Sequence, residues 1–276
     1  MLLYKHDSIP RHQPAKLQNR LKRTEPASLM DWMYLILATF FASLVQSATG
    51  FGFALIAVPF FLIVLNSSDA IQIVIIITLI TSTVHWVLIR KETPLNLLRW
   101  LFVGCTLGFP LGVLIYMHLE LDALKMLIAV LIILISIYNG WQMFRNHRAT
   151  QVPDSKAAKP AALTVVGLTS GMMASSMAMP GPPLMLYLST TALDKNQIRA
   201  AMFAFFTFSY AGALIMQSIF IGVGRQSWEM SGILTPVAII GLFVGQLLSK
   251  KINEAHFKAL VLIILLMTGS VMLLNL

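Results

Sequence analysis

The stretch SATGFGFALIAVP, residues 47–59, interrupts a sequence that otherwise suits a helix in lipid. Gly50 and Gly52 stand beside Ser47 and Thr49 in the middle of a long apolar run. Glycine has the backbone freedom to end a helix, and Ser and Thr hydroxyls compete for the hydrogen bonds that a helix needs. A second interruption, SSMAMPGPPLMLY at residues 175–187, occurs in the other half of the chain. The pattern predicts two broken helices at corresponding places.

The composition is that of an integral membrane protein. Hydrophobic residues make up 57% of the 276 residues and only 11% are charged, whereas about a quarter of a soluble globular chain is charged. The mean hydropathy is +0.78. We therefore expect an α-helical, multi-pass protein of the inner (cytoplasmic) membrane. Apolar segments near the ~20 residues that a membrane helix needs lie at residues 71–89, 95–117, 123–144, 198–223, 230–248 and 257–274.

The formal net charge is +9, and the placement of the basic residues gives the orientation. Most Lys and Arg residues after residue 30 fall in alternate loops, at residues 90–99, 145–159, 195–199 and 250–258. The opposite loops hold Lys125 and Arg225. Cytoplasmic loops are enriched in Lys and Arg, so this asymmetry indicates membrane topology and not nucleic-acid binding. The lone Cys105 excludes an intrachain disulfide.

The chain divides into a tail, two membrane repeats and a linker. We expect residues 1–30 to be a polar, basic tail that is disordered or lies upstream of the true start, because Met30 directly precedes the first apolar segment. The first repeat is predicted at residues 31–145 and the second at 161–276, joined by a basic cytoplasmic linker at 146–160.

A gap-free alignment of the two interruptions indicates that the unit is duplicated. The stretch GFPLGVLIYMHLELDALKM, residues 108–126, also aligns with GLFVGQLLSKKINEAHFKA, residues 241–259. Identities are few, but the features follow the same order in both halves. The alignment pairs Ser47 with Ser175, Gly50 with Ala178, Gly108 with Gly241, and Gly112 with Gly245.

Each half begins with a pair of short apolar segments, at residues 32–48 with 51–65 and at 163–177 with 182–193. Segments this short suit discontinuous or re-entrant helices whose breaks lie at membrane depth. Three longer segments follow, so each half makes an odd number of net crossings and the halves are inverted. If each pair instead crosses once, the halves are parallel. The loop charges favour an all-α integral membrane protein of two homologous, inverted repeats, each with a broken or re-entrant helix pair plus three transmembrane helices.

Broken helices at matching positions in two repeats point to the binding site of a transporter. A helix that begins at membrane depth presents unpaired N–H groups at its positive end, which suits an anion. Glycines allow close backbone approach, and hydroxyl and amide groups add donors. The alternative is that these small residues serve helix packing. The predicted substrate-binding residues are Gln46, Ser47, Thr49, Gly50, Gly52, Ser175, Ser176, Gly181, Pro182 and Tyr187.

Ionisable residues are nearly absent inside the apolar segments. The acidic residues after residue 30 lie at segment ends or in loops, which disfavours a cation pathway, because such pathways use buried carboxylates. His85 lies inside a segment and, with Thr81, is a candidate relay for a proton or an anion; a packing histidine is the alternative. No nucleophile–base or metal-ligand grouping is evident within the segments, so we expect no enzyme, no cofactor and no metal site.

The two interruptions resemble the paired glycine-rich motifs of the sulfite exporter TauE/SafE family of bacterial membrane permeases. The likeness extends from about residue 31 to the end of the chain. Phe53 stands where the family has a second glycine, and Ala178 and Pro180 replace glycines in the second half. The matching residues are Gly50, Phe51, Gly52 and residues 54–59 in the first half, and Gly181, Pro182, Pro183, Leu184, Leu186 and Tyr187 in the second.

This resemblance implies movement of sulfite, an organosulfonate or a related small organic anion across the cytoplasmic membrane by secondary transport. The alternatives are a passive anion channel and a non-transporting membrane assembly factor. The expected partners are the small anion and the lipid bilayer, without nucleic acid; a homo-oligomer is left open.

Overall fold

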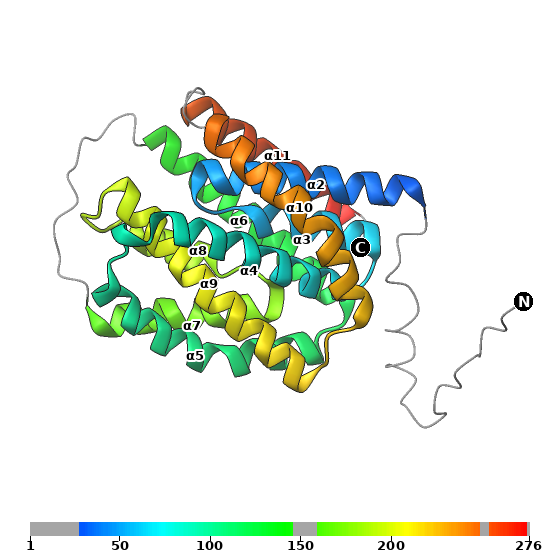
Figure 1. Ribbon diagram of the computed structural model, residues 1–276, viewed down its shortest axis with the longest axis horizontal. Coiled ribbons are helices and arrows are strands. Elements are labelled where there is room, and N and C mark those ends of the chain that lie inside the picture. The colour runs from blue at the N-terminus through cyan, green and yellow to red at the C-terminus, as the bar shows by residue number, and fades with distance from the viewer. Residues whose placement is uncertain (1–27, 146–158, 249–253, 275–276) are drawn as a thin grey trace, which may run out of the picture.

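The computed structural model describes residues 28–145, 159–248 and 254–274, and all of the regular structure in these ranges is helical. The predicted tail, apart from its last three residues, and the predicted linker, apart from its last two, lie outside these ranges. The helices lie side by side in one bundle (Figure 1). In chain order they are α2 (Leu29–Thr49), α3 (Phe53–Leu65), α4 (Asp69–Ile89), the short 3₁₀ helix η1 (Arg90–Glu92), α5 (Leu95–His118), α6 (Leu121–Arg145), α7 (Pro160–Met177), α8 (Gly181–Leu188), α9 (Lys195–Phe220), α10 (Arg225–Leu248) and α11 (Glu254–Leu274).

Six helices in the described ranges are long and apolar enough to cross a membrane. The predicted all-α, multi-pass membrane class is therefore confirmed. The six cover Leu29–Thr49, Asp69–Glu92, Leu95–His118, Leu121–Tyr138, Lys195–Phe220 and Arg225–Leu248.

The first member of the first pair is longer than predicted. Helix α2 has 21 residues, because it begins at Leu29 with a capping box. The Ser28 hydroxyl accepts a hydrogen bond from the Asp31 N–H, and the Asp31 carboxylate accepts one from the Ser28 N–H at 3.0 Å. Of the two pairs, the markedly short helices are α3, with 13 residues, and α8, with 8.

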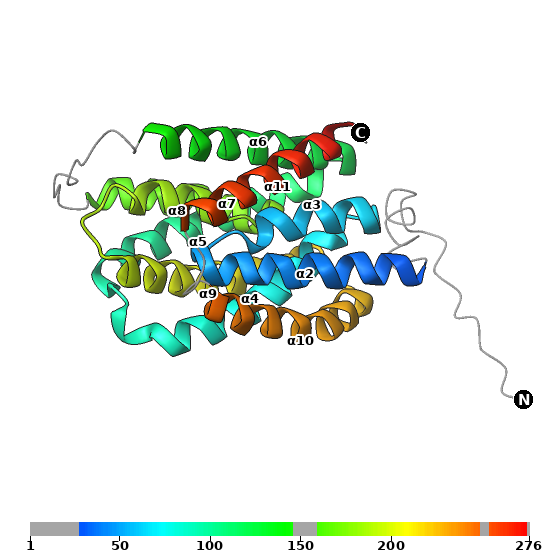
Figure 2. The same cartoon turned by 90° about the horizontal axis from the view of Figure 1, so that it is seen from above.

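The two helix pairs have the form of hairpins that enter the bundle from opposite ends. Helix α2 runs inward from the end where the described chain begins, and α3 returns toward that end (Figure 2). Helix α7 runs inward from the other end, and α8 turns back toward it (Figure 1). The remaining helices pack beside the two hairpins in the same bundle.

Helices α5 and α7 pack with their backbones in direct contact. A Cβ atom added at Gly104 or Gly108 would overlap the carbonyl oxygen of Thr164 or Leu168. On the α7 side of the contact, Cβ atoms added at Gly167 and Gly171 would meet the backbone of α5. Close approach through small residues is the usual way in which membrane helices associate. These glycines are packing residues.

The interface between α2 and α10 repeats two of the contacts between α5 and α7, those of Gly108 and Gly112, at aligned residues. An added Cβ at Gly241 would meet the Phe40 carbonyl, as one at Gly108 would meet that of Leu168. At Gly245 it would meet the Leu44 carbonyl and Ser47, as at Gly112 it would meet the Met172 carbonyl and Ser175. The alignment already pairs Gly241 with Gly108, Gly245 with Gly112 and Ser47 with Ser175, and the same spacing pairs Phe40 with Leu168 and Leu44 with Met172.

Candidate functional site at the two helix breaks

The first break lies between α2 and α3. Gly50 ends α2 in the left-handed conformation, with φ 87°, and its N–H donates to the Gln46 carbonyl at 2.8 Å. Gly52 follows at φ 113°, a backbone conformation that residues with a side chain rarely adopt. The Thr49 hydroxyl contacts the carbonyls of Val45 and Phe51. Three of the predicted site residues therefore shape the break itself.

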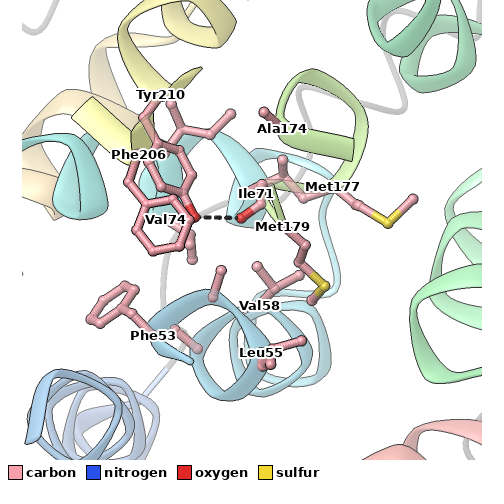
Figure 3. Close-up of a cluster of buried hydrophobic side chains, with 14 of the residues drawn as sticks. Phe53, Leu55, Val58, Ile71, Val74, Ala174, Met177, Met179, Phe206 and Tyr210 are labelled. Atoms are coloured by element: carbon pink, nitrogen blue, oxygen red, sulfur yellow. Dashed lines mark hydrogen bonds between the residues drawn. The ribbon is translucent and has the colours of Figure 1, made fainter. Parts of the chain in front are cut away.

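The second break, between α7 and α8, begins as the first does but continues differently, because Pro180, which the same alignment pairs with Gly52, has a φ of −70°. Ala178 ends α7 at φ 58°, also left-handed, at the position that the alignment pairs with Gly50. Its N–H donates to the Ala174 carbonyl at 3.1 Å, and its carbonyl accepts a hydrogen bond from the Tyr210 hydroxyl of α9 at 2.8 Å (Figure 3). This bond holds an alanine in a conformation that costs a residue with a side chain about 1–2 kcal/mol.

The two breaks meet around one cavity of about 10 Å³. That volume is close to the minimum for a single water molecule, so sulfite or a sulfonate does not fit in this conformation. Figure 3 shows several of the side chains that gather here, among them Phe53 from α3 and Phe206 and Tyr210 from α9. The lining residues are Gln46, Phe51, Gly52, Phe53, Ala54, Leu55, Met179, Gly181, Pro182, Phe206 and Tyr210. Gln46, Gly52, Gly181 and Pro182 were predicted.

The two short helices offer different donors to this central cavity. The first N–H of α3 to bond back to the chain is that of Ile56, which donates to the Gly52 carbonyl at 3.2 Å. The N–H groups of Phe53, Ala54 and Leu55 thus have no acceptor within their own helix. Helix α8 begins with two prolines after Gly181, and proline has no N–H. The positive end of α3 is therefore the stronger anion-binding end.

A chain of polar contacts surrounds the end of α2. The Ser47 hydroxyl lies 3.4 Å from His85 Nε2, and the Gln46 amide donates to the Ser82 hydroxyl at 3.5 Å. The His85 ring is buried and stacks on Phe203, with the ring centres 4.3 Å apart. The predicted relay histidine thus contacts the predicted Ser47. Its partner in that prediction, Thr81, bonds to carbonyls of its own helix, those of Ile77 and Thr78.

Six predicted residues do not line the central cavity: Ser47, Thr49 and Gly50, which lie at the first break, and Ser175, Ser176 and Tyr187 in the second half. The contacts of the last three are as follows. The Ser175 hydroxyl donates to the Phe109 carbonyl of α5 at 2.9 Å, and the Ser176 hydroxyl donates to the Met172 carbonyl at 2.7 Å. Tyr187 is half-buried on α8 and does not line the cavity. In this conformation the three side chains belong to helix contacts, which agrees with the packing alternative for them.

Arg199 lies in a helix, although the sequence predicted it as one of the basic loop residues. Helix α9 begins at Lys195, because the Asp194 carboxylate accepts hydrogen bonds from the N–H groups of Asn196 and Gln197, both at 2.8 Å. Arg199 therefore lies in the second turn of a helix, half-buried. Its guanidinium donates to the Ser47 carbonyl at 2.7 Å. The capping motif Asp-x-x-Gln before an apolar run is the sequence signal for this placement.

A second, larger cavity of about 450 Å³ reaches Arg199 from the end of the bundle. We call it the basic vestibule, because three cations and one carboxylate line it. It lies between the end of α4, η1, the start of α9 and the end of α10. Its lining residues are Val87, Leu88, Ile89, Arg90, Lys91, Glu92, Asn196, Arg199 and Gln246.

The family described as "Sulfite exporter TauE/SafE" matches residues 35–272, which include both breaks, the central cavity and the whole vestibule. The chain belongs to this family. As a TauE/SafE protein it is a multi-pass membrane protein of a transporter family, as the resemblance of the two glycine-rich stretches indicated. Searches of curated proteins and of solved structures gave no match.

Proposed function

We propose that this TauE/SafE protein is a secondary transporter that moves sulfite, an organosulfonate or a related small anion across the cytoplasmic membrane, with its central binding point at the two helix breaks. The observation that carries the proposal is the central cavity. Both breaks line it, the first residues of α3 and Gln46 are among its lining residues, and no acidic side chain is among them. Such a surface favours a small oxyanion over a cation.

The same proposal takes the two halves as inverted repeats. Two features support it. The hairpins α2–α3 and α7–α8 enter the bundle from opposite ends (Figure 2). Gly108 and Gly112 of α5 contact α7 in the same way as Gly241 and Gly245 of α10 contact α2, and the alignment pairs the residues involved. In inverted-repeat transporters the substrate site lies between the repeats near mid-membrane.

Transport then requires the central cavity to open. At about 10 Å³ it has room for about one water molecule. Movement of one hairpin and its neighbouring helices against the other would enlarge the cavity and connect it to one face at a time.

The test is transport by purified protein in liposomes, with sulfite, sulfate, thiosulfate, methanesulfonate and acetate compared. We expect saturable uptake of at least one sulfur oxyanion, accelerated when the same anion is loaded on the opposite side. In detergent, that anion at about 100 times its Kd should stabilise the folded state by ~2.7 kcal/mol. Flux that is neither saturable nor accelerated by counterflow would indicate the channel alternative. The absence of flux and of stabilisation with every anion would contradict transport and leave the assembly-factor alternative.

The variant that tests the central cavity is Gln46→Leu, which removes the amide at similar volume. Its matched control is Ser136→Ala on α6, which removes a buried hydroxyl that donates to the Ile132 carbonyl at 2.7 Å and does not line the cavity. We expect flux to fall about tenfold or more in Gln46→Leu, since a lost hydrogen bond to a charged group costs ~1.5–3 kcal/mol, and to stay near wild type in the control. Equal flux in the two variants would remove Gln46 from the site.

Proton coupling through His85 is a separate part of the proposal, supported by its contact with Ser47. His85→Gln keeps a side chain that can donate to the Ser47 hydroxyl but cannot titrate. If His85 carries the coupled proton, flux in this variant no longer responds to an imposed pH gradient. Gradient-driven flux at the wild-type level in His85→Gln would exclude this role.

A further inference from the structure

We propose that the basic vestibule is an anion-entry site and that Arg199 blocks the way from it to the α2 break. The guanidinium stays bonded to the Ser47 carbonyl until an oxyanion in the vestibule accepts its hydrogen bonds instead. The ligand class is a small oxyanion with two or more acceptor oxygens, such as sulfite or a sulfonate. The inference rests on the proposed function in one respect, namely that the anion continues from the vestibule through the α2 break.

Arg199 stands between the vestibule and the break. It lines the vestibule, and its guanidinium donates to the carbonyl of Ser47, in the last turn of α2, at 2.7 Å. Its Cγ atom lies 3.3 Å from the place that a Cβ atom would take at Gly50. The side chain therefore fills the space beside the break, and an anion that moves from the vestibule toward α2 meets it first.

Most of the binding capacity of this guanidinium is unused. An arginine has five N–H donors. The buried Nε of Arg199 has no hydrogen-bond partner, and in the part of the chain that the structure describes no carboxylate forms a salt bridge with it. A partly buried charge without a counter-charge is costly. An oxyanion would supply the missing charge and can accept two hydrogen bonds from the guanidinium edge at once.

The rest of the vestibule suits the same ligand. Its volume of about 450 Å³ lies within the range of small-molecule sites, ~300–1,000 Å³. Arg90 and Lys91 add two cations to its wall, against the single carboxylate of Glu92. A cleft with an excess of one charge attracts ligands of the opposite sign and raises their local concentration.

The second break shows that a helix end of this kind does not need a charged partner. The carbonyl of Ser175, which the alignment pairs with Ser47, accepts a hydrogen bond from the Gln217 amide at 2.8 Å. Gln217 is neutral and fully buried. Because a glutamine suffices to hold the equivalent carbonyl, the charge of Arg199 serves something besides holding α2.

The test uses Arg199→Gln, which copies the pairing of the second break and so keeps a donor for the Ser47 carbonyl. The matched control is Arg225→Gln, an exposed arginine on α10 that pairs with Glu229 and does not line the vestibule. For the best-transported anion we expect KM to rise about 10- to 100-fold in Arg199→Gln and to stay within about twofold in Arg225→Gln. The double variant Arg90→Gln/Lys91→Gln should raise KM several-fold with kcat unchanged. A wild-type KM in Arg199→Gln would overturn the inference.

A labelling measurement covers the case in which Arg199→Gln does not fold. Asn196 lines the vestibule and is exposed, whereas the natural Cys105 is buried. In full-length Cys105→Ala/Asn196→Cys, methanesulfonate should slow maleimide labelling, and acetamide, a neutral molecule of similar size, should not. The same protection with Arg199→Lys added should need a higher methanesulfonate concentration. Equal labelling rates with and without methanesulfonate would overturn the entry site.

The two proposals fail differently in these experiments. Protection of the Asn196→Cys variant without flux of any anion would leave the vestibule as a binding site and contradict transport. Saturable flux without protection, with an unchanged KM in Arg199→Gln, would leave the permease and overturn the role of Arg199.

Discussion

The breaks of the two hairpins begin with the same left-handed backbone conformation and differ in their electrostatics. Each ends its first helix with a left-handed residue, Gly50 or Ala178, and each offers the carbonyl of a paired serine to a side chain of α9. At the first break that side chain is the cation Arg199, beside a large cavity; at the second it is the neutral, buried Gln217. The comparison teaches that two breaks with a similar start and aligned partners can differ in charge and in access to a cavity.

The largest expected effect comes from the contact that the halves have in common. In Gly112→Val, the new side chain would collide with the Met172 carbonyl and the Ser175 hydroxyl. In Gly245→Val, it would meet Leu44 and Ser47. We expect both variants to lose more than about 4 kcal/mol of folding free energy, seen as aggregation in size-exclusion chromatography or a greatly lowered Tm.

The control for these variants is Gly140→Ala on α6, where an added Cβ meets nothing within 4 Å. Alanine favours a helix over glycine by ~1 kcal/mol, so this variant should be as stable as the wild type or more. If Gly112→Val alone unfolds and Gly245→Val does not, the two interfaces are not energetically equivalent.

The next effect sharpens the electrostatic difference between the breaks. Gln217→Arg places a cation at a fully buried position that lines neither the central cavity nor the basic vestibule. An unpaired buried charge costs several kcal/mol, and we expect a loss of about 3 kcal/mol or more. Arg199→Gln, the reverse exchange, should cost less than ~1.5 kcal/mol. Thermal unfolding in detergent measures both, and an equal loss in the two variants would contradict the comparison.

The smallest effect concerns the left-handed residue of each break. Ala178→Gly relieves an alanine held at φ 58° and should raise stability by up to ~1 kcal/mol, less the flexibility that glycine adds to the unfolded chain. Gly50→Ala should change the stability in the opposite direction. It puts a side chain at φ 87° and 3.3 Å from Arg199 Cγ, and we expect a loss of about 1–2 kcal/mol. Both effects are measured as changes in Tm. If the two exchanges raise Tm together or lower it together, the breaks differ in backbone strain as well.

The sequence predicts the class and the places of both breaks, because apolar run length and glycine, serine and proline at fixed positions are local signals. It also predicts four residues of the central cavity, Gln46, Gly52, Gly181 and Pro182. It does not place Ser175 and Ser176, because a serine in a membrane helix can face a ligand or bond to its own helix, and only packing decides between them.

Arg199 could not be assigned from composition, because its partner Ser47 lies 152 residues away in the other half of the chain. Charge counting treats it as one more basic residue near a membrane face. Its inward position depends on the capping register of α9 and on the place at which α2 ends, Thr49, two residues after Ser47.

The glycine contacts have a consequence for how the chain is made. Helix α7 packs on α5, which precedes it, so its partner is already present when it leaves the ribosome. Helix α2 packs on α10, which is synthesised only after every other helix except α11. The hairpin that enters the membrane first is therefore the one that waits longest for its partner, and until then its polar break depends on whatever in the nascent bundle or the insertion machinery shields it from lipid.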